Sequence, residues 1–306
     1  MARDSKLVTK SPFWAGIRLM RPWNVMMIAA AMALITHSLV LPNSNVPDEY
    51  RDTLLILGII SMTSLAAGAN IINDYFDITE DRINRPNKAL VGRVISRRQT
   101  MALNYLFIAI AIGSTASISA MLGNYVHVIW ILTVGVLLWG YSPFFKRRFL
   151  RGNLIIAFSV GQLPFWCLLL FQPMTSWVDW LDTERGWILL SYGVLSAWVT
   201  FLREITKDLQ DLNGDTAAGY DTLPVRWGTN KSMKFLKLLH GAGWIVMALA
   251  WMESIQQLSR PIAPLFFILP YLAATIQLWR GQVASVSAWQ KMTLAGGLIY
   301  LIGMLG

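Results

Sequence analysis

The chain of 306 residues is 55% hydrophobic and 14% charged, and its mean hydropathy is +0.48. Its apolar residues occur in long runs and not in the periodic stripes of a soluble helix, which excludes an ordinary soluble domain. The formal net charge of +9 comes from Lys and Arg residues beside those runs. Because no soluble domain is available to present a nucleic-acid-binding surface, no nucleic-acid partner is expected.

The apolar runs predict an all-α integral membrane protein, a single bundle of about nine transmembrane helices, each close to the ~20 residues that a bilayer core requires. The predicted spans are 23–41, 54–72, 102–121, 126–140, 153–171, 187–202, 234–252, 263–279 and 288–305. No linker or low-complexity tract divides the chain, so a single domain over residues 1–306 is expected.

The positive charges predict how these spans are oriented. With the N-terminus inside, 23 of the 26 Lys and Arg residues fall in cytoplasmic segments, which agrees with the positive-inside rule. Both acidic motifs described below are then cytoplasmic. Without a recognisable transit peptide, the expected location is a prokaryotic inner membrane.

A basic and aromatic segment, Arg18–Asn24, opens the first predicted span. Arg21 and Asn24 can reach a substrate from this position. The alternative is that Arg and Trp side chains simply anchor the helix at the membrane interface.

The first acidic motif, residues 70–93, follows the second predicted span. Asn70, Asp74, Asp77 and Asp81 stand at i, i+4, i+7 and i+11, which places their side chains on one face if the stretch is helical. Asn70 or Asn73 can add a neutral oxygen ligand for a metal. The alternative is a solvated loop whose acids balance nearby arginines.

Pro86 is expected to end this helix, because the residue before a proline is disfavoured in the α region. The turn that follows would direct Arg85 and Lys88 back toward the acidic side chains, where they can hold phosphate oxygens.

Between the two motifs, the inner end of the fourth span reads WGYSPFFKRR, residues 139–148. Tyr141 is placed to donate a hydrogen bond, and Lys146 and Arg147 can draw an anionic head group inward. An ordinary inside-facing anchor cluster is the alternative.

The second acidic motif, residues 203–228, repeats the offsets of the first with Glu204, Asp208, Asp211 and Asp215. Arg203 and Lys207 lie one turn apart on the same predicted helix. They can reach a phosphate, or each can pair with a neighbouring acid.

Two rows of like charges beside membrane segments repel and require compensating cations. Mg²⁺ is the simplest compensator, since it takes carboxylate oxygens and leaves room for phosphate oxygens. The pattern therefore predicts an enzyme that handles a lipid diphosphate. A carrier is disfavoured, because its acids would tend to lie at mid-bilayer and not at helix ends.

The sequences NDYFDITED with INRP, and KDLQDLNGD with AAGYDTLPVRWG, together resemble those of the UbiA-type intramembrane prenyltransferase superfamily. The resemblance implies a helical bundle around a central cavity, two Mg²⁺ ions and transfer of a polyprenyl group from its diphosphate. It implies metal or catalytic roles for Asn70, Asn73, Asp74, Asp77, Asp81, Asp208, Asp211 and Asp215, and diphosphate binding by Arg85, Lys88, Lys146, Arg147 and Lys207, to which we add Tyr141 and Arg203 as candidates.

Within that superfamily the motifs look most like the branch that alkylates geranylgeranylglyceryl phosphate. The implied partners are a prenyl diphosphate donor, a lipid-phosphate acceptor and membrane lipid. Residues 87–91 read NKALV where that branch often has a basic, proline-containing run. An aromatic acceptor of quinone synthesis, a hydroxybenzoate or a naphthoate, therefore remains the alternative. In either reaction Asp211 or Asp215 is the candidate proton acceptor.

Overall fold

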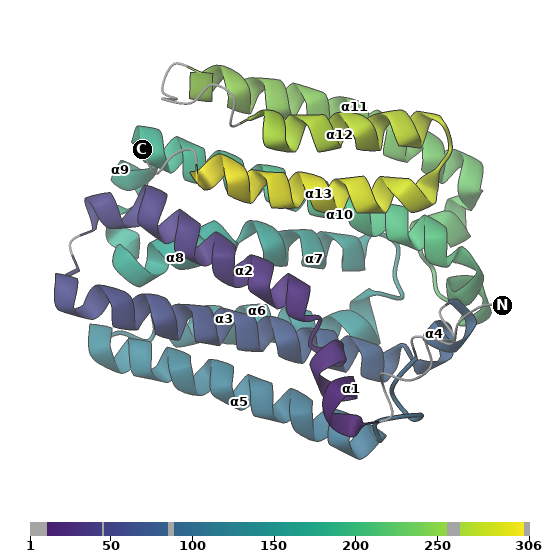
Figure 1. Cartoon of the computed structure of the whole chain (residues 1–306), viewed down its shortest axis with the longest axis horizontal. Coiled ribbons are helices and arrows are strands. Elements are labelled where there is room, and N and C mark those ends of the chain that lie inside the picture. The colour runs from purple at the N-terminus through teal and green to yellow at the C-terminus, as the bar shows by residue number, and fades with distance from the viewer. Residues whose placement is uncertain (1–10, 45, 85–88, 256–263, 303–306) are drawn as a thin grey trace.

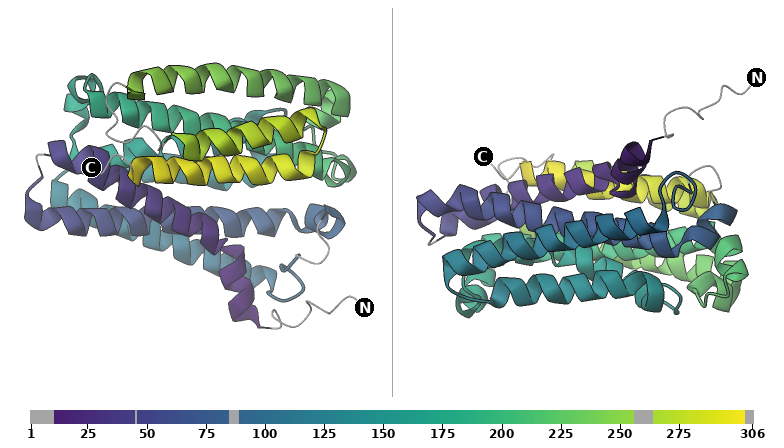
Figure 2. Two further views of the ribbon diagram at one scale, coloured as in Figure 1. Left: turned by 45° about the horizontal axis from the view of Figure 1, so that its top comes forward. Right: turned by 90° about the horizontal axis from the view of Figure 1, so that it is seen from below.

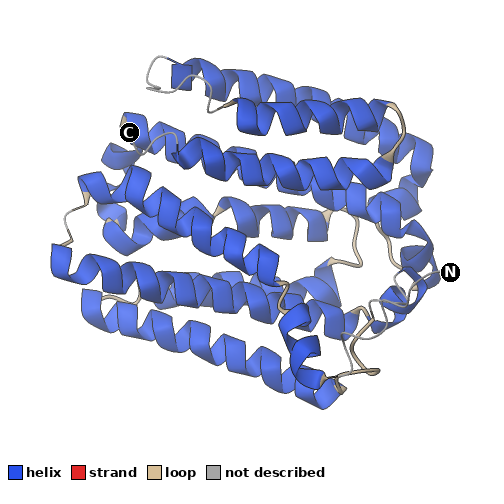
Figure 3. Cartoon of the chain, in the orientation of Figure 1, coloured by secondary structure: helices blue, strands red, loops and turns tan. Residues whose placement is uncertain are grey.

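The computed structural model describes residues 11–44, 46–84, 89–255 and 264–302. These residues fold into helices joined by short connections, and none of them belongs to a strand (Figure 3). The elements in chain order are α1 (Pro12–Leu19), α2 (Pro22–Ile35), η2 (Thr36–Val40), η3 (Leu41–Asn43), α3 (Asp48–Phe76), α4 (Ile78–Asn84), α5 (Arg97–Leu122), α6 (Val126–Gly140), η4 (Tyr141–Phe145), α7 (Arg151–Gly161), α8 (Leu163–Phe171), η5 (Met174–Ser176), α9 (Trp177–Leu181), α10 (Glu184–Ala217), α11 (Leu223–Ile255), α12 (Leu265–Trp279) and α13 (Val283–Ile302).

The long helices lie roughly along one axis, side by side (Figures 1 and 2). Helices α11, α12 and α13 form one edge of the bundle and α3, α5 and α6 the opposite edge, with α2, α7, α8 and α10 between them. Helix α4 and the turn from α10 to α11 meet at one end of the bundle, and α4 packs on α10. This end carries both acidic motifs.

Within the part of the chain that the structure describes, six helical segments are long and apolar enough to cross a membrane: 22–43, 48–76, 97–122, 126–145, 151–171 and 184–217. A shorter apolar helix covers 265–279. The prediction of an integral membrane protein is therefore supported by the first six predicted spans. The last three predicted spans overlap α11, α12 and α13, none of which is among these six segments, so the predicted count of nine spans is not confirmed. Residues 263 and 303–305 of these spans lie outside the described part of the chain.

Two predicted spans differ in shape from simple helices. The first continues from α2 into a π-helical segment, η2, which is followed by the short 3₁₀ helix η3. The fifth is divided into α7 and α8 at Gln162, just before Pro164. Proline has no N–H to donate and its ring clashes with the carbonyl four residues earlier, so the helix cannot run straight through.

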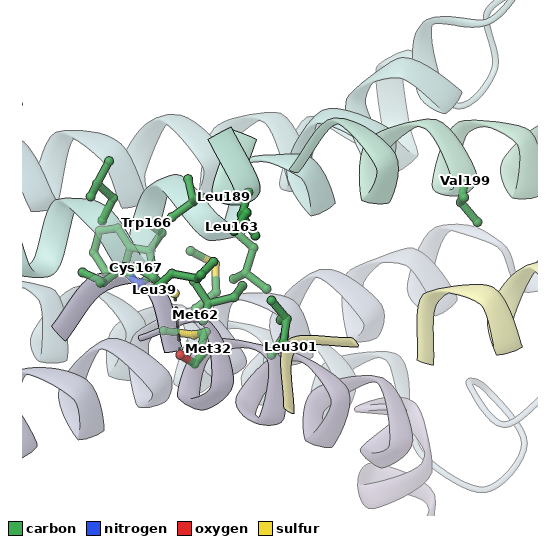
Figure 4. Close-up of a cluster of buried hydrophobic side chains, with 14 of the residues drawn as sticks. Met32, Leu39, Met62, Leu163, Trp166, Cys167, Leu189, Val199 and Leu301 are labelled. Carbon is green, nitrogen blue, oxygen red and sulfur yellow. Dashed lines mark hydrogen bonds between the residues drawn. The ribbon is translucent and has the colours of Figure 1, made fainter. Parts of the chain in front are cut away.

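The bundle has a buried apolar core, part of which is drawn in Figure 4. Met32, Leu39, Met62 and Trp166 from α2, η2, α3 and α8 lie close together there, and at most 4% of any of these side chains is exposed. The lone Cys167 is buried in the same cluster and forms no disulfide.

Helices α7 and α10 cross closely where two glycines face each other. A Cβ atom on Gly161 would lie 3.0 Å from the carbonyl oxygen of Gly193, and one on Gly193 would lie 2.9 Å from that of Gly161. Small residues permit such backbone approach between membrane helices. The crossing brings α7, which begins beside the acidic motifs, against the long helix that carries the second motif.

Candidate functional site

The first acidic motif extends over the end of α3 and the start of α4. Helix α3 ends at Phe76, and Asp77 then adopts φ −86° and ψ 13° before α4 begins at Ile78. The predicted single helical face for residues 70–81 is therefore wrong at its second half, because Asp81 lies on a different helix from Asp74. The four acids of the second motif do lie on one uninterrupted helix, α10.

Each of the first two aspartates is paired with a cation from a distant part of the chain. Arg21 Nη2 lies 2.7 Å from Asp74 Oδ1, and Lys146 Nζ lies 2.5 Å from Asp77 Oδ2. Arg21 precedes α2 in a left-handed conformation with φ 54°. Such backbone is costly outside glycine and is found where surrounding structure enforces it, often at functional sites.

The asparagines of the first motif orient their neighbours. Asn73 Nδ2 donates to Asp77 Oδ2 at 2.7 Å, and its own Oδ1 accepts from Ser142 Oγ at 3.2 Å. Asn70 Nδ2 donates to the carbonyl of Met20 at 3.0 Å, next to Arg21. Asn73 therefore holds Asp77 from within the motif, whereas Asn70 ties the motif to the segment before α2.

The second motif uses neutral donors for two of its aspartates. Asn153 Nδ2, from α7, donates to Asp208 Oδ2 at 2.8 Å. Thr222 Oγ1, from the connection after α10, donates to the buried Asp215 at 3.2 Å. These bonds orient the carboxylates without cancelling their charge.

Glu204 stands where the first motif has Asn70, and its surroundings differ from those of the aspartates. Its buried carboxylate accepts from Arg203 Nη1 at 3.2 Å and from Lys207 Nζ at 2.8 Å. Arg203 and Lys207, both candidates for diphosphate binding, are thus engaged by the neighbouring acid. The structure favours the pairing alternative for both cations.

The two motifs lie within electrostatic range of one another, and Lys146 interacts with an acid of each. Its burial alone would lower its pKa, but the negative charges of Asp77 in the first motif and Asp215 in the second favour the charged form. The net result is that the pKa of Lys146 is raised, so the ammonium persists between the motifs.

Several other predicted residues can be placed. Tyr141 lies half-buried in the π-helical segment η4, the same segment that supplies Ser142. The exposed Arg147 guanidinium lies 5.2 Å from the ring centroid of Tyr220. Asp81 and Asp211 are half-buried. Arg85 and Lys88 lie outside the described residues.

The donor set suits a hard divalent cation, since carboxylate and amide oxygens are the ligands that Mg²⁺ prefers. Asp77 Oδ1 is buried and has no hydrogen-bond partner in the structure. Among the described residues no three His, Cys, Asp or Glu side chains converge into a preformed metal cage. Mg²⁺ in phosphate sites takes one or two carboxylates plus substrate oxygens, so this arrangement fits such an ion.

Ser142, Asn153 and Thr222 hydrogen-bond to residues of the two motifs but were not singled out from the sequence. Asn153 is the clearest case, because an amide directly after a basic cluster, at the start of an apolar span, is a recognisable signal. Arg21 was considered as a contact for substrate, and the structure pairs it with Asp74.

A model of the UbiA prenyltransferase family matches residues 20–297. Digeranylgeranylglyceryl phosphate synthase of Methanosarcina mazei is 30% identical over 277 residues, which is 86% of this chain and 90% of that protein. The synthase of the same name from Sulfurisphaera tokodaii is 33% identical over 189 residues, covering 60% of this chain and 62% of that relative.

Solved structures share the fold. One, from work on digeranylgeranylglyceryl phosphate synthase in membranes, aligns with a TM-score of 0.65 at 20% identity and covers 96% of this chain and 99% of the other. A UbiA homologue from Archaeoglobus fulgidus, bound to DMAPP and Mg²⁺, aligns with a TM-score of 0.59 at 18% identity over 94% of this chain and 99% of that one.

Proposed function

Because the chain belongs to the UbiA prenyltransferase family, we propose that it transfers a geranylgeranyl group from geranylgeranyl diphosphate to geranylgeranylglyceryl phosphate. The observation that carries this proposal is the similarity to digeranylgeranylglyceryl phosphate synthases, one of which aligns over 90% of its own length. The acidic end of the bundle supplies side chains suited to that chemistry.

We also propose how the chain is oriented in the membrane. The chain is one domain with nine spans, its N-terminus and both acidic motifs face the cytoplasm, and the membrane is a prokaryotic inner membrane. The distribution of Lys and Arg supports this orientation. It would bring a cytoplasmic diphosphate directly to the polar end of the bundle.

We propose that two Mg²⁺ ions bind, and the Mg²⁺-bound UbiA homologue from Archaeoglobus fulgidus motivates metal use here. When bound, Mg²⁺ neutralises the charge that develops on a departing diphosphate. Asn73, Asp74 and Asp77 would supply oxygens at the first motif, together with Asn70 and Asp81. Asp208, Asp211 and Asp215 would do so at the second.

The basic residues around these carboxylates would bind the diphosphate. Lys146 and Arg21 already lie at the first motif as charged groups, so a short movement can present either to a phosphate oxygen. Arg147, Arg85 and Lys88 are further candidates on neighbouring connections, and Tyr141 can donate a hydrogen bond. Lys207 and Arg203 would have to leave Glu204 to take part.

In the proposed reaction the bond between C1 of the prenyl group and the diphosphate oxygen breaks. A bond between C1 and the acceptor hydroxyl oxygen forms, and the hydroxyl proton passes to a carboxylate. Asp211 and Asp215 are the candidate proton acceptors at the second motif. The diphosphate leaves with both electrons of the broken bond, and an ether lipid is the product.

The test is an acceptor assay with protein purified in detergent, radiolabelled geranylgeranyl diphosphate and Mg²⁺. We expect label to enter an ether lipid when geranylgeranylglyceryl phosphate is supplied, and not when a hydroxybenzoate or a naphthoate acid is supplied. Label in a prenylated aromatic acid, with none in the ether lipid, would contradict the lipid acceptor and support quinone synthesis. No transfer to any acceptor, with the protein folded, would contradict the enzyme itself.

A further inference from the structure

The two acidic motifs are joined directly by one side chain at the end of α4. Asn84 Nδ2 donates to the carbonyl oxygen of Asp211 at 3.3 Å, and Asn84 Oδ1 accepts from the backbone N–H of Gly214 at 3.1 Å. A single amide thus bonds to both a carbonyl and an N–H of α10. Asn84 lies three residues after Asp81, and Gly214 directly precedes Asp215.

Glycine at position 214 is required by this contact. A Cβ atom there would lie 2.2 Å from Asn84 Nδ2 and 2.6 Å from Asn84 Cγ. Real side chains do not approach so closely, so any other residue at 214 must push Asn84 away from α10. Gly214 is buried within α10, and its lack of a side chain leaves the space that the Asn84 amide occupies.

A second contact between the same two segments lies beside the first. Tyr220, in the connection after α10, donates its hydroxyl to Glu80 Oε1 of α4, and both side chains are buried. Burial, together with this bond to Glu80, raises the pKa of Tyr220, so its proton stays in the contact at neutral pH. The next residue, Asp221, contacts a third segment: its backbone N–H donates to the carbonyl of Arg147, between η4 and α7, at 3.0 Å.

We infer that Asn84, Gly214 and Tyr220 are positioning residues that set the separation of the two acidic motifs. The inference rests on the proposed function, in which both motifs hold one diphosphate with its metal ions. Asn84 acts through Asp211 and Gly214, and Tyr220 acts through Glu80. Side chains on separate helices bind one group tightly only when the distance between them is fixed. Small displacements of such side chains lower the reaction rate by large factors.

The experiment is a double-mutant cycle with Asn84→Ala, Gly214→Ala and the combined variant. Each single change should raise the KM for geranylgeranyl diphosphate, and the Mg²⁺ concentration needed for half-maximal activity, by about tenfold. The double variant should be no worse than either single one, because both changes remove the same contact. Tyr220→Phe should show the same direction of change with a smaller effect, since its ring remains.

A second measurement, of thermal unfolding, does not depend on prenyl transfer. Mg²⁺ with inorganic pyrophosphate should raise the thermal unfolding temperature of the wild-type protein in detergent, and that stabilisation should be reduced in Asn84→Ala and Gly214→Ala. The matched control is Gly113→Ala on α5, where a Cβ would meet nothing within 4 Å. It should behave as wild type in both measurements.

Three results would overturn the positioning role: wild-type KM and pyrophosphate response in both single variants, effects that multiply in the double variant, or equal effects from Gly113→Ala. These are separable from failure of the proposed function. If the wild-type protein transfers no prenyl group but Gly214→Ala still loses the response to Mg²⁺ and pyrophosphate, the proposed reaction fails and the positioning role stands.

Discussion

The guanidinium of Arg21 lies 2.7 Å from the carboxylate of Asp74, although 53 positions separate them in the chain. Lys146 and Asp77, 69 positions apart, form the equivalent pair one turn further along. The carboxylates of the first motif are therefore compensated by cations from two other elements. In the proposed reaction, binding of a diphosphate with its metal ions would release these cations to the phosphate oxygens, and the carboxylates would bind the metal.

Replacing one aspartate in either motif should remove most of the activity. We expect Asp74→Ala and Asp208→Ala each to lower kcat/KM by about 10²- to 10³-fold, because each removes a carboxylate proposed to hold the Mg²⁺ that stabilises the departing diphosphate. The measurement is transfer of radiolabel in detergent, with circular dichroism to confirm that the variants remain helical. Asp52→Ala, an exposed aspartate on the same helix as Asp74, is the control and should retain full activity. Near-normal transfer by both variants would remove these residues from the mechanism.

Removal of divalent metal should abolish turnover. A chelator such as EDTA should reduce transfer to background, and excess Mg²⁺ should restore it, since neutral or monovalent species cannot replace a divalent ion between carboxylate and diphosphate oxygens. The control is the same chelator already saturated with Mg²⁺. Full activity after metal removal would contradict the proposed chemistry.

Loss of the cation beside Asp77 should destabilise the metal-free protein. The side chain of Asp77 is only 7% exposed and that of Lys146 is 22% exposed, so Lys146→Met leaves a buried charge uncompensated, at a cost of about 3–5 kcal/mol. In EDTA the thermal unfolding temperature should fall by roughly 5–10 °C. Mg²⁺ with pyrophosphate should reduce this deficit, because the ion can replace the missing positive charge.

The control for that change is Lys231→Met, which removes an exposed lysine on α11. It should leave the unfolding temperature within about 1 °C of wild type. If Lys146→Met unfolds at the wild-type temperature in EDTA, the ion pair makes no contribution to stability.

Two glycines on α11 should respond differently to the same substitution. A Cβ on Gly243 would lie 2.0 Å from the Tyr271 hydroxyl, which donates to the carbonyl of His240, whereas a Cβ on Gly241 would meet nothing within 4 Å. Gly243→Ala should therefore cost about 1–3 kcal/mol through overpacking. Gly241→Ala should be neutral or stabilising by up to ~1 kcal/mol, because alanine favours a helix. Comparable unfolding temperatures for the two variants would contradict the tight contact at Tyr271.

The sequence predicted the helical elements better than their interruptions. The span predicted at 126–140 has the bounds of α6, because an apolar run alone defines it. The fifth span is divided before Pro164, and the first motif is interrupted at Asp77. Pro164 in the sequence is a signal for the break in the fifth span. The second break lies at Asp77, whose side chain accepts hydrogen bonds from Asn73 and Lys146, and hydropathy cannot report such a tertiary contact.

The candidate site shows the same limit. Offsets of four and seven residues identified Asp74, Asp77 and Asp208 as acids on the polar end of the bundle. Their partners could not be found in that way, because Arg21, Lys146 and Asn153 come from other elements and only the packing of those elements brings them to the acids.

The glycine crossing of α7 and α10 implies that the site can be damaged from a distance. Asn153 lies eight residues from Gly161, about 12 Å along α7, and Asp208 lies fifteen residues from Gly193, about 22 Å along α10. A bulkier residue at the crossing would tilt α7 and α10 relative to each other. Because both helices are rigid, the tilt would displace the site residues on them. A substitution deep in the apolar interior would then be recorded in an assay as a catalytic defect, although it contacts no ligand.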